Sequence, residues 1–404
     1  MKNYRKTTLV LFTSYFPYIG GEQFLETEII YLSNAFEKIY IIPTVRTNKF
    51  RYIPKNVEII DIVATANKNI FTRISKALTS MFFYKNISLN IKELKYHFIN
   101  HIYLGLSQNA IKDMIYSKKI IIENTIFYTY WFNYTTTAIS LIKNKYPNLT
   151  FFSRVHRGDL YEERLEFKEF PTRNKVLKTI NKVFSISSDG KIHLTKKFPK
   201  YSEKFLVARL GVNQPNFKSL PSDDNTLRIV SCSYLVPVKR VNLIIKALEN
   251  LNSTKIEWTH IGDGILKERL LEESKIKLGK NIKYNFLGTL TNNQVFEFYQ
   301  NHKVDVFINV SASEGIPVSI MEAQSCSIPI IATDVGGTRE IVNNTNGVLL
   351  SANPTIKEIK KQLIDVHKNK DKWNKKRELS FSTWNEYYNA DSNYKNFIET
   401  IHLL

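Results

Sequence analysis

The chain alternates short apolar runs with helical patterns, and this alternation constrains the fold more than any other feature. Runs such as TTLVLFT, KIYIIPT and LTFFSRV have the length and the β-branched and aromatic content of buried strands. Helical patterns such as EQFLETEIIYLSNAF and TTTAISLIKNKY lie between several of them. A repeated strand–helix order predicts an α/β protein with parallel sheets and helices on both faces.

The alternation runs twice. The stretch Asn213–Thr226 is polar, rich in turn-forming residues and without an apolar period, which indicates a linker. After it the pattern starts again with LRIVSCSYL and continues to GVLL. A chain of 404 residues, 43% of them hydrophobic, can bury two cores. We therefore expect a first domain over residues 1–212, a second over residues 213–380, and a helical tail over residues 381–404.

Composition limits the class of partner and the compartment. Lys and Arg outnumber Asp and Glu by 57 to 37, a formal net charge of +20. This charge attracts nucleic acid, an anionic membrane or phosphorylated substrates, although a Lys-rich, solvated surface also explains it. The two cysteines, Cys232 and Cys326, argue against a disulfide framework and fit a reducing compartment. An apolar run of about six residues near the N-terminus favours a strand over a signal peptide. The sequence has no run of about eighteen apolar residues, so we expect no transmembrane helix.

The segment Phe71–Lys119 breaks the alternation. It carries many lysines and several aromatic residues but little acid, and its pattern predicts amphipathic helices. Two interpretations stay open at this point. The segment either packs against the first domain, or presents a basic, aromatic face to a membrane or a lipid-linked substrate.

Two carboxylates lie eight residues apart around the start of one predicted helix. Glu314 follows the apolar strand VDVFINV and sits in a Gly-Pro turn, and Glu322 lies about one and a half turns into the next helix. Ligands of open parallel sheets bind beyond the carboxyl ends of the strands. Because helical side chains tilt toward the N-terminus of their helix, both carboxylates can face that region. For an isolated pair of glutamates, the simpler interpretation is one capping and one solvated residue.

The start of this helix also suits an anion. Pro317 near the first helical position leaves the amides of Val318 and Ser319 without partners, and these donors and the helix dipole favour a phosphate. A carboxylate that accepts two neighbouring hydroxyls is the usual way to hold a ribose, a role that suits Glu322. One segment can thus bind a diphosphate, a ribose and a sugar.

The stretch SEGIPVSIMEAQSCSIPIIATDVGGTREIV resembles the signature of the family-four retaining glycosyltransferases, also called glycosyl transferases group one, of the bacterial surface-polysaccharide type. CSYLVPVKRVNLIIKAL, THIGDGILKERL and NFLGTLTNNQVFEFY agree in order, and FPYIGGEQFLETEI and SRVHRGDLYEER resemble its segments in the first half. The resemblance is strongest over Leu227–Val348. It implies the GT-B fold, in which two doubly wound Rossmann-like domains face a cleft and the last helix crosses back to the first domain.

The resemblance also implies roles for single residues. Lys239 would bind the donor diphosphate, Glu314 would contact the donor sugar, and His156 would lie near the reacting sugar. These three form the expected catalytic set. Asp159 would orient His156 or the acceptor, and Gly20 and Gly21 would let the backbone approach the donor phosphates or the acceptor. The full set of expected donor-binding residues is Gly20, Gly21, Lys239, Arg240, Gly315, Ile316, Pro317, Val318, Ser319 and Glu322.

The chain departs from the family pattern at two positions. Tyr234 stands where the family often has an Arg, and Arg240 stands where it usually has a Gly after the Lys. The second cation for the diphosphate is therefore either Arg240 or missing. No Asp-x-Asp run follows a strand, which argues against a metal-bridged donor and favours neutralisation by Lys, Arg and helix dipoles. We expect no metal and no cofactor, since the nucleotide sugar is a substrate.

The resulting hypothesis is a retaining enzyme that moves a sugar from a nucleoside diphosphate sugar to a glycan acceptor, lipid-linked, in the synthesis of capsule, O-antigen or exopolysaccharide. We expect it in the cytoplasm, peripheral to the inner face of the cell membrane, with no nucleic-acid partner. One alternative is a soluble acceptor such as a sugar phosphate. A second is a basic protein without enzymatic activity that binds membrane or nucleic acid.

Overall fold

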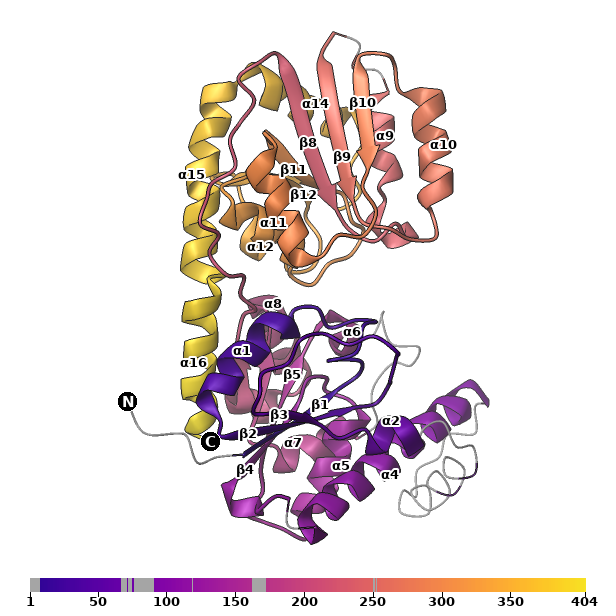
Figure 1. Cartoon of the computed structure of the whole chain (residues 1–404), viewed down its shortest axis with the longest axis vertical. Helices are drawn as coiled ribbons and strands as arrows, with labels where there is room; N and C mark the ends of the chain where they lie inside the picture. The colour runs from indigo at the N-terminus through magenta and orange to yellow at the C-terminus, as the bar shows by residue number, and fades with distance from the viewer. Residues whose placement is uncertain are drawn as a thin grey trace. The chain divides into compact units, whose positions relative to one another are not determined.

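The computed structural model describes residues 8–66, 71, 75, 91–117, 119–161, 172–249, 251 and 253–404. It divides into two compact units (Figure 1). The first comprises Met1–Ala208 and Tyr394–Leu404, and the second comprises Arg209–Asn393. Within the described part, no helix is both long enough and apolar enough to cross a membrane.

The first unit is built on a seven-stranded parallel sheet in the order β3-β2-β1-β4-β5-β6-β7. The chain winds outward from β1 in one direction and then from β4 in the other, so the strand order reverses between these two neighbours. Such a reversal is where open α/β sheets bind ligands. The strands are β1 (Thr8–Thr13), β2 (Lys38–Pro43), β3 (Val57–Ile59), β4 (Thr125–Thr129), β5 (Thr150–Val155), β6 (Lys182–Ser185) and β7 (Phe205–Val207).

Helices cover both faces of this sheet (Figure 1). They are α1 (Leu25–Ala35), α2 (Ile62–Ala66), α4 (Ile91–Tyr116), α5 (Tyr134–Lys143), α6 (Arg157–Leu160), α7 (Arg173–Thr179) and α8 (Ser188–Lys197), with 3₁₀ turns η1 (Ile122–Asn124) and η3 (Pro199–Lys204). Alternate residues of β1 enter different cores because successive strand side chains point to opposite faces. Leu9 and Leu11 pack with α1 on one face, whereas Val10 and Phe12 pack with α4 and α5 on the other.

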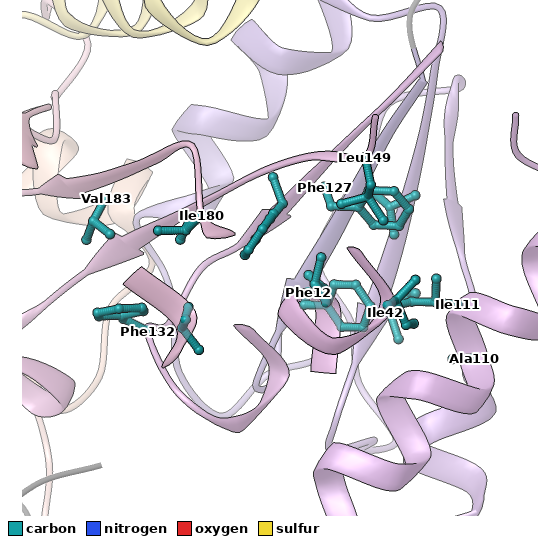
Figure 2. Close-up of a cluster of buried hydrophobic side chains, with 14 of the residues drawn as sticks. Phe12, Ile42, Ala110, Ile111, Phe127, Phe132, Leu149, Ile180 and Val183 are labelled. Atoms are coloured by element: carbon teal, nitrogen blue, oxygen red, sulfur yellow. The ribbon is translucent and has the colours of Figure 1, made fainter. Parts of the chain in front are cut away.

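The described part of α4 packs against the first unit. Ile102, Leu106, Ala110 and Ile111 are buried in the core that also contains Phe12 of β1, and Figure 2 shows Ala110 and Ile111 beside Ile42 in this cluster. This observation favours the packing interpretation for the second half of the segment Phe71–Lys119. Residues 72–74, 76–90 and 118 of that segment lie outside the described residues.

The second unit is built on a six-stranded parallel sheet in the order β10-β9-β8-β11-β12-β13. Its order reverses between β8 and β11, as in the first sheet. The strands are β8 (Thr226–Cys232), β9 (Lys255–Ile261), β10 (Ile282–Phe286), β11 (Val306–Asn309), β12 (Ile330–Thr333) and β13 (Gly347–Leu350). The helices are η4 (Pro237–Lys239), α9 (Asn242–Leu248), α10 (Lys267–Lys277), α11 (Asn292–Asn301), α12 (Val318–Ser325), α13 (Thr338–Ile341), α14 (Ile356–Lys368) and α15 (Lys370–Tyr387).

The C-terminal residues divide between the two units. A break at Tyr388 and Asn389 separates α15 from the last helix, α16 (Ala390–His402). From Tyr394 onward the chain groups with the first unit, where Phe397 and Ile401 are buried in the core beside α1. The predicted α/β fold with two doubly wound parallel sheets is confirmed. All loops that follow a strand within one sheet lie at the same edge because the strands are parallel.

Candidate active site

The second unit brings Lys239 and Glu314 together. Lys239 ends the η4 turn after β8, and Glu314 lies in the loop after the neighbouring strand β11. The Lys239 Nζ atom lies 2.6 Å from Glu314 Oε1, and their side chains are 21% and 10% exposed. The side-chain Nδ2 of Asn309 donates to the same oxygen at 3.3 Å. A backbone bond of 2.8 Å from Ala312 N to Val238 O ties the two loops together.

Arg240 links several loops of the second unit. Its Nε donates to Val310 O at 2.8 Å, its Nη2 donates to Ser311 O at 2.8 Å and Ala352 O at 2.9 Å, and its Nη1 donates to Asn353 Oδ1 at 3.0 Å. A guanidinium has five N–H donors, so four of them are used. The backbone of Arg240 is left-handed, with φ of 50°, a conformation that glycine adopts most readily. This explains why the family pattern has Gly at this position.

The loop before α12 holds the expected phosphate-binding amides. Pro317 is extended and precedes the helix, so Val318 and Ser319 are its first two residues. Their amides have no acceptor one turn earlier in the helix. The Gly315 carbonyl accepts a 3.0 Å bond from Gly337 N. A Cβ atom on Gly337 would lie 2.8 Å from the same carbonyl oxygen, so the two loops approach more closely than a side chain allows.

Glu322 is half-buried on α12 and has one partner that the sequence did not suggest. The Asn292 side chain, from the first residue of α11, donates to Glu322 Oε1 at 2.5 Å. Burial raises the pKa of Glu322 to about 7, against the opposing effect of the Asn292 bond. Its Oε2 accepts no hydrogen bond from the residues that the structure describes. Oε2 therefore remains available to a ligand hydroxyl.

In the first unit, Gly20 and Gly21 lie in the loop after β1. Gly20 has φ of +156°, and a Cβ atom there would lie 2.5 Å from Cδ1 of Tyr15. Glycine is therefore required by the close approach of the Tyr15 ring as well as by the backbone. Across the described residues, neither Gly20 N nor Gly21 N donates a hydrogen bond. Both amides can serve an incoming polar group.

His156 follows β5 and is buried among aromatic rings. Its ring centroid lies 4.5 Å from that of Tyr130, 4.7 Å from that of Trp131 and 6.0 Å from that of Phe24. Both ring nitrogens lack a hydrogen-bond partner within the described part of the chain. Burial, assisted by Arg154, holds the pKa of His156 well below its usual range, so the imidazole is neutral. A neutral imidazole offers one donor and one acceptor.

Asp159 contacts the main chain of His156 and not its ring. The carboxylate accepts from His156 N at 2.7 Å and from Phe132 N at 2.6 Å, which joins the loops after β5 and β4. Burial raises the pKa of Asp159 to about 6, opposed mainly by the nearby Arg173. The contact fixes the backbone at the start of α6, where the Asp159 carboxylate accepts from the backbone amide of the N-cap residue His156.

Comparison with known proteins identifies the second half of the chain. The model of the family glycosyl transferases group 1 matches residues 212–380. Residues 212–380 belong to the group 1 glycosyltransferases. The resemblance stated from the sequence is confirmed.

The curated relatives of this chain match over part of their length. The O-antigen biosynthesis glycosyltransferase WbnH of Escherichia coli is 31% identical over 162 residues, which are 37% of this chain and 44% of that protein. A probable sucrose-phosphate synthase of Thermosipho melanesiensis is 26% identical over 210 residues, 50% of this chain and 49% of that protein. The chain thus spans about half or less of the length of these relatives.

Solved structures of low sequence identity share the fold over 98% of the chain. HepE of Anabaena, in complex with UDP and glucose, has a TM-score of 0.68 at 15% identity and covers 98% of this chain and 100% of its own. The sucrose-phosphate synthase of Thermosynechococcus elongatus has a TM-score of 0.70 at 12% identity, with 98% of each chain covered. These likenesses confirm the two-domain GT-B fold.

Sequence reasoning missed two side chains of the candidate site. Asn292 holds Glu322, and its only signal was the capping pattern TNNQ, in which Thr291 and Gln294 close the start of α11. Glu22, next to the glycine pair, bonds to three backbone amides after β1. No group of three or more His, Cys, Asp or Glu residues with the arrangement of a metal site occurs in the described ranges.

Proposed function

We propose that this protein is a retaining glycosyltransferase that moves a sugar from a nucleoside diphosphate sugar to a hydroxyl group of a lipid-linked glycan acceptor, in the synthesis of a bacterial surface polysaccharide. The observation that carries the donor half of this proposal is the Lys239–Glu314 pair, 2.6 Å apart, beside the first amides of α12. The relative WbnH, named for O-antigen biosynthesis, and the complex of HepE with UDP and glucose support it.

The diphosphate carries the charge that develops when the bond to the sugar breaks. We propose that Lys239 and the backbone N–H groups of Gly315, Ile316, Val318 and Ser319 neutralise this charge, in place of a metal bridge to the donor. Because four Arg240 donors already bond to carbonyl oxygens, Lys239 supplies the cationic side chain of this proposal. The fixed amide dipoles then carry a larger share of the phosphate charge.

We assign binding of the ribose and of the donor sugar to the two glutamates. Glu322 Oε2 would accept the ribose hydroxyls, since Oε1 is already held by Asn292. Glu314 would contact the donor sugar while its Oε1 remains bonded to Lys239. A carboxylate committed to an ion pair is a poor nucleophile. We therefore propose that the departing diphosphate itself takes the proton of the acceptor hydroxyl, on the face that the leaving group occupies.

For the first unit we propose acceptor binding. His156 is buried and neutral, and both of its ring nitrogens lack a partner within the described residues. A sugar hydroxyl both donates and accepts, so it matches such an imidazole. The amides of Gly20 and Gly21 would take a second polar group of a bound sugar.

A thermal-shift screen over nucleoside diphosphate sugars tests the donor half. A ligand that binds only the folded state raises the unfolding midpoint by an amount set by RT ln(1 + [L]/Kd). We expect at least one nucleotide sugar to raise the wild-type midpoint and to fail with Glu322→Gln. If none raises it, and the protein is nevertheless retained on heparin, the basic-protein alternative replaces the transferase.

The acceptor half has a rival, a soluble sugar phosphate, which the sucrose-phosphate synthase relative favours. Sedimentation with vesicles separates the two acceptors. A lipid-linked acceptor predicts binding to anionic vesicles that salt releases, because each basic residue near the surface contributes about 1 kcal/mol within a Debye length. Lys112 is exposed, whereas Lys119 bonds to Glu58 at 3.0 Å, so Lys112→Gln is the more direct variant. Absence of vesicle binding at low salt favours the soluble acceptor.

A further inference from the structure

Glu22 has a buried carboxylate that accepts hydrogen bonds from four donors. Oε1 accepts from Ser14 N at 2.8 Å and from Trp131 Nε1 at 2.5 Å. Oε2 accepts from Tyr15 N at 2.8 Å and from Phe16 N at 2.6 Å. The residue is only 4% exposed. All four donors are neutral N–H groups, three of them consecutive in the backbone.

These contacts join two loops that carry candidate site residues. Ser14 to Phe16 directly follow β1, and Trp131 follows the neighbouring strand β4. The Trp131 ring in turn packs against His156, with 4.7 Å between ring centroids. Gly20 and Gly21 immediately precede Glu22, whose backbone is left-handed with φ of 56°. The Glu22 carboxylate therefore contacts the backbone that leads into the glycine loop and also the Trp131 ring that packs against His156.

The direction of the amides explains what this arrangement achieves. Three backbone N–H groups at the end of β1 form a concavity that would otherwise attract an anion. Glu22 fills it from within the chain. The amides of Gly20 and Gly21 are left without acceptors across the described residues, and are available to a ligand.

We infer that Glu22 is a positioning residue that orients the Gly20–Gly21 amides and, through Trp131, the imidazole of His156. Its effect on turnover rests on the proposed transferase function, whereas its contact with Trp131 does not. A carboxylate with a purely structural role would change stability alone. A positioning role also changes the rate constant while nucleotide binding by the second unit is kept.

The contact is tested without substrate by the indole N–H resonances of the full chain. The chain has four tryptophans, and Trp131 belongs to the first unit while Trp258, Trp373 and Trp384 belong to the second. Trp131→Phe identifies the Trp131 signal by its disappearance. In Glu22→Gln, an amide N–H₂ replaces one acceptor oxygen, so we expect this signal to shift upfield and the other three to stay. Glu37→Gln, an isosteric change at an exposed glutamate, is the matched control.

The kinetic arm uses whichever nucleotide sugar the thermal-shift screen selects. Misplacing a catalytic constellation by about 1 Å costs on the order of a hundredfold, so we expect Glu22→Gln to lower kcat by roughly ten- to hundredfold. Nucleoside diphosphate affinity should stay within about twofold of wild type, because its proposed ligands lie in the second unit. Trp131→Phe keeps the ring against His156 and removes only the donor, and should show a smaller loss of kcat.

If Glu22→Gln folds, two outcomes overturn the inference. An unshifted Trp131 resonance in folded Glu22→Gln removes the contact itself. If the resonance shifts but the kcat of Glu22→Gln equals that of Glu37→Gln, the carboxylate has a structural role only. If Glu22→Gln does not fold, Trp131→Phe decides, and a kcat equal to the control then refutes the positioning role. If no nucleotide sugar binds the wild type, the proposed function fails while the resonance result still stands.

Discussion

Arg240 offers a sharp test because its side chain and its backbone predict different effects. Replacing it with Ala removes four hydrogen bonds, of which those to Val310 and Ser311 are partly buried and those to Ala352 and Asn353 are exposed. Counting about 1 kcal/mol for each of the first two and about half of that for the others, the loss is about 3 kcal/mol. Ala keeps the left-handed backbone strain that Arg also bears.

Replacement with Gly removes the same bonds but relieves the strain. A left-handed conformation costs an L-residue roughly 1–2 kcal/mol, part of which is offset by the greater freedom of Gly in the unfolded chain. We therefore expect Arg240→Gly to be more stable than Arg240→Ala by about 1 kcal/mol, and less stable than the wild type by about 2 kcal/mol. The order of stability is wild type, then Gly, then Ala.

Urea unfolding in a Trp131→Phe background provides the assay. In that background every remaining tryptophan lies in the second unit, so fluorescence follows the unit that contains Arg240. The change in midpoint multiplied by the slope gives the change in the free energy of unfolding. An Ala variant at least as stable as the Gly variant would refute the strain argument. Wild-type stability combined with a tenfold loss of nucleoside diphosphate affinity would instead make Arg240 a donor ligand, as expected from the sequence.

Three further predictions concern the donor residues. Lys239→Ala should lower kcat by roughly a hundredfold or more with folding intact, the scale for losing one charged donor to the transition state, and a folded variant with normal turnover removes Lys239 from the site. Calorimetry should show weaker nucleoside diphosphate binding for Glu322→Gln, whereas Glu314→Gln should mainly lower kcat; equal affinity of Glu322→Gln and wild type excludes the ribose role. Folded Glu322 keeps its proton up to about pH 7 and the unfolded residue up to about 4.5, so Glu322 should contribute a loss of stability across that window as the pH rises. Unfolding free energies measured at both ends of the window should show that Glu322→Gln removes this contribution.

The sequence by itself determined the order of elements and the local position of the donor residues. The periods of strands and helices extend over only a few residues and can therefore be recognised in the sequence alone. Their alternation predicted both parallel sheets. The same local logic placed Glu314 in the loop after β11 and Glu322 inside α12, where the structure has them. The family signature over Leu227–Val348 is also a local pattern, which is why it predicted the group 1 glycosyltransferase assignment of residues 212–380.

The tertiary structure decided which distant side chains meet. Lys239 and Glu314 are 75 positions apart and pair because β8 and β11 are neighbours in the sheet. Arg240, expected to bind phosphate, bonds to carbonyls of the two loops that follow β11 and β13, and Glu22 accepts from Trp131, 109 positions away. No local period encodes such contacts, because they depend on strand order and on the directions of backbone amides at the strand ends. The tertiary structure likewise decided that α4 packs against the first sheet, where its apolar residues share a core with Phe12 of β1.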